Sequence, residues 1–193
     1  MPHTKQRIVL HRQVTPDDIQ DVAWDLDWNA IEVGIRDSGS LVDVWRTNDG
    51  ETDIRFVQDF PIGTCYLLVS GRGVESVTEN IRSRAFTWTF TEALSFTRRA
   101  AGRDDTLAGI YAVALSADST DRDAAVELLH SMTRSPDPGI RQAVVIATGY
   151  LGWPELIDLV EEIHRTDAVY EVRANAGVLL DGLRRHDTST DEG

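Results

Sequence analysis

Residues 17–29, which read DDIQDVAWDLDWN, hold the densest group of carboxylates in the 193-residue chain. Such a group could bind a metal ion or supply a paired acid and base for catalysis. It lacks the Asp-x-Asp-x-Asp-Gly loop with a closing Glu that a calcium site needs. The spacing instead predicts a helix over residues 16–26, with apolar residues on one face and a solvated acidic face opposite. Because tryptophans lie among these acids, we expect the segment to contact a basic protein through Asp21, Trp24, Asp25 and Trp28.

Other residue types that could carry chemistry are too scattered to define a catalytic centre. The histidines share no ligand spacing that would indicate a metal site: His3, His11, His130, His164 and His186. Cys65 lies in the apolar run CYLLV and is interpreted as a small buried hydrophobe rather than a nucleophile. The turn SGRG at 70–73 could hold a phosphate, but without a P-loop lysine a plain tight turn is favoured. We therefore predict no catalytic residue, metal or cofactor.

The chain has one basic cluster, between residues 82 and 103, in which Glu92 is the opposing acid. Its five arginines lie on either side of an aromatic stretch: Arg82, Arg84, Arg98, Arg99 and Arg103. Arginine beside aromatic residues is a pattern found where proteins contact nucleic acid or another anion. The same arginines could instead pair with acids in the C-terminal half of the chain. This internal role is favoured because the acidic half is adjacent in sequence.

The net charge of −13 is concentrated in the C-terminal half. Residues 1–103 carry 12 Lys and Arg against 15 Asp and Glu, whereas residues 104–193 carry 7 against 17. This weighs against binding a phosphate backbone, which requires clustered cations, although an acidic surface also simply keeps a protein soluble. No apolar run approaches the roughly 18 residues of a membrane span, and the N-terminus has no apolar signal segment. A cytoplasmic location is expected, and a lone cysteine fits a reducing compartment.

The N-terminal half, residues 1–84, alternates strand-like and helical patterns. A β-prone start is followed by the helix over 16–26, and then by a strand in which Ile31, Val33 and Ile35 alternate with polar residues. The runs LVDVWRT and TDIRFVQ flank NDGE, a strong signal for a β-hairpin.

A buried strand over 64–70 and a helix over 73–81 complete this half. The predicted order is β-α-β-β-β-β-α, which indicates a small α+β domain with a mostly antiparallel sheet. Residues 85–103 are expected to connect the halves, with a short strand or extended stretch passing into a helix.

The C-terminal half contains the run SPDPGIRQAVVIATGYLGWPELIDLV at residues 135–160. Asp137 can cap a helix, and Pro138 suits its first turn. Apolar residues then follow at helical spacing until Gly152, after which Pro154 begins a second helix. This pattern predicts two short amphipathic helices joined by a tight turn.

The same pattern recurs at periods of 31 to 33 residues. IRQAVVIA at 140–147 is echoed by VRANAGVL at 172–179 and by LAGIYAVA at 107–114. A single helix pair cannot bury its apolar stripe, but stacked pairs can, so such units occur in rows. DPGIRQAVVIATGYLG and YEVRANAGVLLDGL resemble the first helix of a HEAT-like (armadillo-type) repeat. The resemblance covers residues 104–185 and implies an α-solenoid, and an ordinary helical bundle with accidental periodicity is the alternative.

The resemblance also implies roles for two arginines. Arg141 and Arg173 occupy the arginine position of the repeat, where pairing with an acid of a neighbouring unit is favoured over binding an anion. The copy at 107–114 lacks both the Asp-Pro and the arginine. The polar end of the chain, residues 186–193, is expected to be disordered.

Together these observations favour an α+β domain followed by an α-solenoid that acts as a non-enzymatic protein-binding scaffold, adaptor or inhibitor. HEAT-like arrays serve mostly as scaffolds, and an acidic one would bind a basic protein, as a bacterial immunity or antitoxin-type protein does. The contact residues expected on the repeats are Trp153, Asp158, Glu161 and Glu162. The alternative is a HEAT-like-repeat enzyme or nucleic-acid-handling protein, glycosylase-like or lyase-like. A glycosylase-like protein would need an aromatic-acid pocket, and Trp153 with Asp158 is the one weak match to such a pocket in the sequence. Nucleic acid and membrane are not the expected partners.

Overall fold

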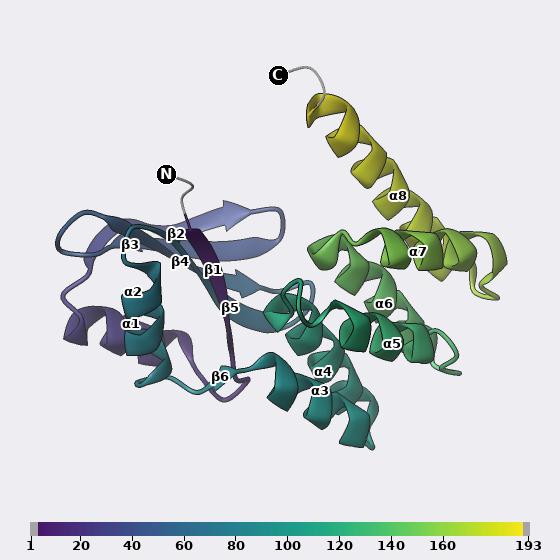
Figure 1. The fold of residues 1–193 in the computed structure, drawn as a ribbon, viewed down its shortest axis with the longest axis horizontal. Coiled ribbons are helices and arrows are strands. Elements are labelled where there is room, and N and C mark those ends of the chain that lie inside the picture. The colour runs from purple at the N-terminus through teal and green to yellow at the C-terminus, as the bar shows by residue number, and fades with distance from the viewer. Residues whose placement is uncertain (1–3, 191–193) are drawn as a thin grey trace. The chain divides into compact units, whose positions relative to one another are not determined.

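The computed structural model describes residues 4–190, with the side chains of residues 5–185, and divides the chain into two compact units (Figure 1). The first unit ends at Thr89 and the second begins at Phe90. Residues 85–103, expected to connect the halves, are divided between the units. They contain the last strand of the first unit and the first helix of the second, in the order that the sequence predicts.

Within residues 4–89, a six-stranded antiparallel sheet packs against two helices. The order across the sheet is β2-β3-β4-β5-β1-β6, and the helices are α1 (Pro16–Asp25) and α2 (Val74–Arg82). The strands are β1 (Thr4–Leu10), β2 (Asn29–Asp37), β3 (Ser40–Arg46), β4 (Thr52–Asp59), β5 (Thr64–Gly71) and β6 (Thr87–Trp88). The predicted order β-α-β-β-β-β-α is confirmed, and β6 adds a short strand that pairs with the end of β1.

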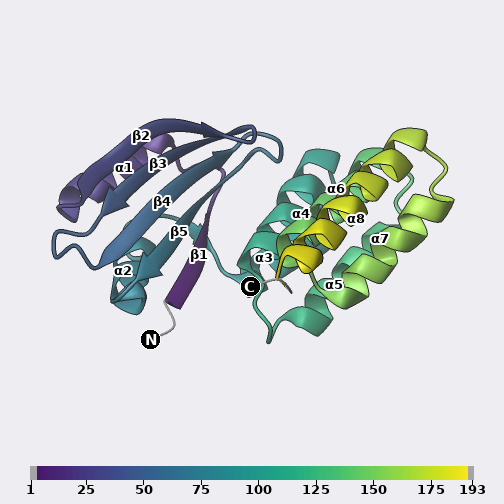
Figure 2. The same ribbon diagram turned by 90° about the horizontal axis from the view of Figure 1, so that it is seen from above.

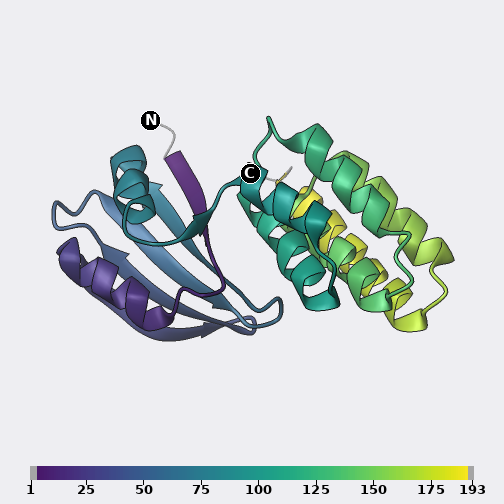
Figure 3. The same ribbon diagram turned by 90° about the horizontal axis from the view of Figure 1, so that it is seen from below.

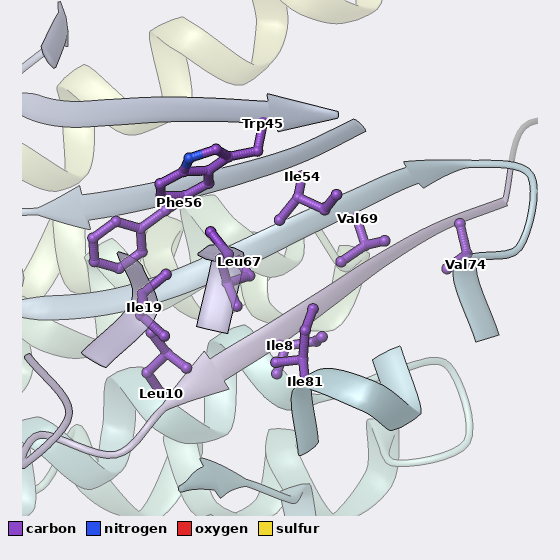
Figure 4. Close-up of a cluster of buried hydrophobic side chains, with 11 residues drawn as sticks. Ile8, Leu10, Ile19, Trp45, Ile54, Phe56, Leu67, Val69, Val74 and Ile81 are labelled. Atoms are coloured by element: carbon purple, nitrogen blue, oxygen red, sulfur yellow. The ribbon is translucent and has the colours of Figure 1, made fainter. Parts of the chain in front are cut away.

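Both helices cover the same face of the sheet, which is the face turned toward the viewer in Figure 3. The register places Leu67 opposite both Ile8 and Phe56, so their side chains share this face. They pack with Ile19 of α1 and Ile81 of α2 in one buried cluster (Figure 4). Removing each such side chain from water contributes roughly 1.5–3 kcal/mol, so this cluster holds the helices on the sheet.

Local signals fix both ends of α1. At its start, Thr15 and Asp18 form a capping box in which each side chain accepts a hydrogen bond from the other residue's backbone N–H. At its end, Asp27 takes a φ of 52°, and the Trp28 N–H donates to the Ala23 carbonyl at 2.9 Å. This is the hydrogen-bond pattern of a Schellman motif, with aspartate in the left-handed position that glycine usually fills. It turns Trp28 back onto the core, where its ring centroid lies 6.4 Å from that of Trp45.

The edge strand β2 forms where the sequence predicts a strand, but two of its apolar residues are not buried. The Ile31 and Val33 side chains are 49% and 68% exposed. The pairing of β2 with β3 shifts register twice, and the Gly34 N–H donates to Asp43 Oδ1 at 2.7 Å instead of continuing the ladder. Such bulges turn side chains away from the face they would otherwise occupy, and they also make an edge strand a poor template for further strands.

The second unit consists of helices, of which the described residues contain six. They are α3 (Phe90–Arg99), α4 (Arg103–Ser116), α5 (Arg122–Met132), α6 (Pro138–Leu151), α7 (Pro154–Thr166) and α8 (Tyr170–Thr190). In one layer α4 packs on α6 and α6 on α8, and in the other α3 and α7 both pack on α5 (Figure 2). Helix α8 includes the first five residues of the segment 186–193 that was expected to be disordered, and residues 191–193 lie outside the described part.

Helix α6 begins and ends where the sequence predicts. Asp137 caps it by accepting a hydrogen bond from the Gly139 N–H at 2.7 Å, and Pro138 occupies its first turn. Gly152, with a φ of 62°, closes it, and Pro154 then begins α7. The tight turn lets α6 and α7 pack as an antiparallel pair, which is the repeating element of the unit.

Helix α4 is the most buried helix among residues 90–185, since every residue from Gly109 to Leu115 is buried. It lacks a polar face because α3, α5 and α6 all pack against it. Gly109 meets the side chain of Thr97, and a methyl group added to this glycine would overlap the threonine. Thr97 cannot easily move, because its hydroxyl donates to the Ala93 carbonyl at 2.7 Å.

We predict that Gly109→Ala lowers the free energy of unfolding of the second unit by roughly 1–3 kcal/mol, because it overpacks the contact of α3 with α4. Gly182→Ala is the matched control, because no atom lies within 4 Å of the added methyl group on α8. There the substitution gains helix propensity and should stabilise by up to about 1 kcal/mol. Urea unfolding followed by circular dichroism measures both. Equal effects of the two variants would contradict the close packing at Gly109.

Candidate functional site

An ion pair between Arg141 and Asp167 links neighbouring helix pairs of the second unit. Arg141 lies on α6, and Asp167 lies in the turn between α7 and α8. The distances are 2.6 Å from Nε to Oδ2 and 2.9 Å from Nη2 to Oδ1, so the pair is bidentate. The two side chains are only 12% and 4% exposed. The remaining Nη1 donates to the Ser135 carbonyl at 2.8 Å, and the Val169 N–H donates to Asp167 Oδ1 at 2.8 Å.

The hydrogen bonds from Arg141 lower the pKa of the Asp167 carboxyl below its ordinary value, against the opposing effect of burial. The same pair raises the pKa of the Arg141 guanidinium. Both groups are therefore charged at neutral pH. A buried and fully bonded pair of this kind leaves no cation free to bind an anion.

Two more arginines make related contacts. Arg173 donates from Nη1 to the Asp167 carbonyl at 2.5 Å, and Arg103 Nε lies 2.8 Å from Oδ2 of Asp137, the N-cap residue of α6. The prediction that Arg141 pairs with an acid of a neighbouring unit is confirmed. Arg173 also has a structural role, although its partner is a carbonyl and not a carboxylate.

The acids predicted on the repeats all lie on the outer surface of α7. Asp158 is three residues before Glu161 and four before Glu162, so the three are neighbours on the helix surface, and all are exposed. Glu161 lies 3.8 Å from Arg184 of α8. Trp153 is half-buried at the N-cap, and the Arg122 guanidinium lies 5.3 Å from its ring centroid. That ring is thus occupied by a cation of the chain and does not form an aromatic-acid pocket with Asp158.

Sequence reasoning missed the acids of α5 that continue this surface. Asp123 and Glu127 are exposed, and they line a groove of about 350 Å³ between α5 and α7 together with Arg122, Val126, His130 and Glu155. The repeat period could have found them. At the offset of 31 residues that aligns the buried residues of α5 with those of α7, Glu127 corresponds to Asp158, and Glu155 lies one position beyond the counterpart of Asp123. We call Asp123, Glu127, Glu155, Asp158 and Glu162 the α5–α7 surface.

The acidic face predicted on α1 is present, but only part of the expected contact surface lies on it. Trp24 is 84% exposed, and Asp21 and Asp25 beside it are exposed as well. Trp28 is half-buried and packs against the core of the first unit, so it belongs with the structural residues. Its neighbour Asp27 causes the difference, because the left-handed turn there folds the chain back.

The arginines of the basic cluster are divided between the two units. Arg82 and Arg84 lie at the end of α2, where Arg84 donates to the Asn80 carbonyl at 3.1 Å. In the second unit, Arg98 lies 3.5 Å from Glu127 and Arg103 pairs with Asp137, as described above. Arg99 donates to the Ser95 carbonyl at 3.1 Å. The ion pairs of Arg98 and Arg103 support the internal role over an anion site.

Cys65, considered as a nucleophile, and the SGRG turn, considered as a phosphate site, both have structural roles. Burial, and after it the charge of Asp59, raises the pKa of the Cys65 thiol, which makes it a poor nucleophile at neutral pH. In the SGRG turn, Gly71 has a φ of 126° and lies against the Glu51 carbonyl, which accepts from the Arg72 N–H at 3.0 Å. Close backbone approach is what this glycine provides.

Within residues 4–190, no cluster of three or more His, Cys, Asp and Glu residues could hold a metal ion. His3 lies outside the described part. In the same range, none of the helices combines the length and the apolar character needed to cross a bilayer.

The fold of the second unit defines an α-solenoid, in which antiparallel helix pairs stack side by side in two layers. Residues 95–181 match the HEAT repeats, and the N-terminal half matches no family. The helices of the second unit are consistent with HEAT-like repeats, which commonly act as scaffolds for protein interaction. No curated protein and no solved structure matches the chain.

We predict that Asp167→Asn lowers the free energy of unfolding by about 3 kcal/mol at pH 7, because it leaves the Arg141 charge buried and unpaired. Since folding lowers the pKa of Asp167, the pair stabilises the protein above the ordinary aspartate pKa of about 3.9, and its contribution is lost as the pH falls through the folded value. The difference between wild type and variant should therefore shrink below about pH 4. Denaturant unfolding at several pH values measures it.

The control for this prediction is Asp181→Asn, which removes an exposed pair with Arg184 at 3.6 Å. It should cost less than about 1 kcal/mol. If Asp167→Asn were no more harmful than this control, the pair would not hold the repeats together.

The two tryptophans near the end of α1 should differ in how much they contribute to the stability of the fold. We predict that Trp28→Ala costs at least about 2 kcal/mol, since it removes an indole packed on the core. Trp24→Ala should change stability by less than about 0.5 kcal/mol. Thermal unfolding of both variants tests the assignment of Trp24 to a contact surface and Trp28 to the core, and a large loss for Trp24→Ala would contradict it.

Proposed function

We propose that this protein is a non-enzymatic scaffold or inhibitor that binds a basic protein partner through the α5–α7 surface. The observation that carries the proposal is the regular placement of exposed acids along two neighbouring HEAT helices. HEAT repeats commonly serve as protein-interaction scaffolds. The partner's cations would meet carboxylates held at fixed spacing by the packed helices beneath them.

The ion pairs within this surface leave part of its charge available. Glu127 and Glu155 have arginine neighbours at 3.5 and 3.6 Å, and both pairs are largely exposed. In the described part of the chain, Asp123, Asp158 and Glu162 make no side-chain ion pair. Exposed pairs exchange partners at little cost, so a basic protein could recruit all five acids.

The exposed face of α1 supports a second contact. It carries acids and no basic residue, and Trp24 protrudes from it. A tryptophan ringed by carboxylates suits an arginine or lysine, because the cation can lie on the indole face while a carboxylate neutralises it. Asp21, Trp24 and Asp25 are the residues that we assign to this contact.

We predict that reversing charge on the α5–α7 surface abolishes capture of the partner. Immobilised protein should retain a basic protein from native lysate at low ionic strength, and release it as salt is raised. The double variant Asp158→Lys with Glu162→Lys should reduce retention at least tenfold, because it replaces attraction with repulsion at the centre of the surface. Asp181→Lys, an exposed reversal on α8, is the matched control and should retain the partner.

Retention that is insensitive to both salt and the double variant would contradict the assignment of this surface. The more specific version, an immunity or antitoxin-type inhibitor, is supported by the acidity of the chain and predicts that the captured protein is a toxin. Co-expression should then rescue cells from that toxin with wild type but not with the double variant.

A further inference from the structure

A second surface of the helical unit has the opposite character to the α5–α7 surface. Helices α6 and α8 border a groove of about 540 Å³ in which no lining side chain is charged. Its lining residues are Gln142, Val145, Ile146, Gly149, Tyr150, Asn175, Val178 and Leu179. Val178 is 68% exposed at its rim, which makes it one of the most exposed large apolar residues of this unit. We call this the α6–α8 groove.

The groove is open because Gly149 has no side chain. A methyl group at this position would lie 3.2 Å from Leu179 Cδ1. The glycine therefore lets α8 approach α6, and no side chain from position 149 fills the bottom of the groove. At one end the Asn175 Nδ2 donates to Gln142 Oε1 at 3.1 Å.

The surface of α8 beside the groove is self-complementary. Glu171, Val178 and Arg185 are seven residues apart, so they lie along one face of the helix, and all three are exposed. If a second α8 ran antiparallel to the first with the two Val178 residues together, Glu171 of each copy would lie opposite Arg185 of the other. The spacing of seven residues, about 10 Å along the helix, is the same on both sides of Val178.

From these features we infer that the protein forms a two-fold symmetric homodimer in which the α8 helices pair antiparallel along the α6–α8 grooves. A chain with a net charge of −13 repels its own copies over most of its surface. The uncharged groove avoids that repulsion, and the Glu171–Arg185 pairs fix the direction of the helices. This surface is separate from the one proposed to bind a basic partner.

The dimer should be weak, because the eight lining residues are about a third of the 20–30 residues that each partner contributes to a standard interface. Sedimentation equilibrium of the full chain should show a mass that rises with concentration, from 21.5 kDa toward twice that value. Val178→Asp should abolish the rise, because it places two carboxylates together at the axis. Tyr170→Asp, also on α8 and 69% exposed but outside the groove, is the matched control and should dimerise as wild type does.

Charge reversal tests the direction of pairing. Glu171→Arg and Arg185→Glu should each weaken self-association roughly tenfold, because each places like charges opposite one another twice in the dimer. An equimolar mixture of the two variants should recover wild-type association, since each arginine then meets a glutamate. Circular dichroism confirms that each variant is folded.

A wild-type chain that stays monomeric at all concentrations would overturn the inference, as would a dimer that Val178→Asp leaves intact. A dimer weakened by Val178→Asp, but with no recovery in the mixture, would overturn the antiparallel arrangement. None of these outcomes affects binding of a basic partner by the α5–α7 surface, which the charge reversals on α7 test separately.

Discussion

The packing of α8 on the α6–α7 pair depends on a single buried carboxylate, that of Asp167. It accepts two hydrogen bonds from Arg141 of α6 and one from the Val169 N–H ahead of α8, while the carbonyl of the same residue accepts from Arg173. Apolar stripes alone allow neighbouring helix pairs to slide, because many registers bury a similar area. A bidentate pair that is nearly excluded from water tolerates only one register, since any other leaves two buried charges unpaired. The pair therefore fixes the register of α8 on the α6–α7 pair, and the groove between α6 and α8 depends on that register.

The distribution of charge over the two helix layers follows from what each layer packs against. Helix α4 is buried throughout residues 109–115, and α6 carries no charge after Arg141, so these two helices offer few positions at which a charge could be solvated. Charges therefore lie mainly on α5, α7 and α8, which have exposed faces. One layer consequently has an acidic surface suited to a basic protein, and the other has a neutral groove suited to an apolar contact. The same packing that stabilises the repeats thus separates two kinds of interaction.

Much of the fold follows from local signals, and what does not follow depends on contacts distant in sequence. The bounds of α6 are set by Asp137, Pro138 and Gly152, all within a turn of its ends, so the sequence predicts them well. The exposure of Ile31 and Val33 depends on bulges stabilised by Asp43, a residue of the next strand, and alternation alone cannot reveal it. Trp24 and Trp28 look equivalent in sequence, yet the turn at Asp27 sends one to solvent and the other to the core. For the surfaces, the acids of α7 could be named from composition, whereas those of α5 required the repeat period to be applied to charged as well as apolar residues.

That period has a functional consequence for the α5–α7 surface. Because Glu127 corresponds to Asp158 at the offset of 31 residues, these two acids occupy equivalent positions on neighbouring helices, whose axes pack about 8–10 Å apart. A folded partner with cations at that separation can engage both helices without reorganising, and so loses little conformational entropy on binding. A flexible basic peptide would have to order itself to match the same spacing. The rigid stack therefore discriminates by geometry as well as by charge, which an acidic but disordered segment of the same composition could not do.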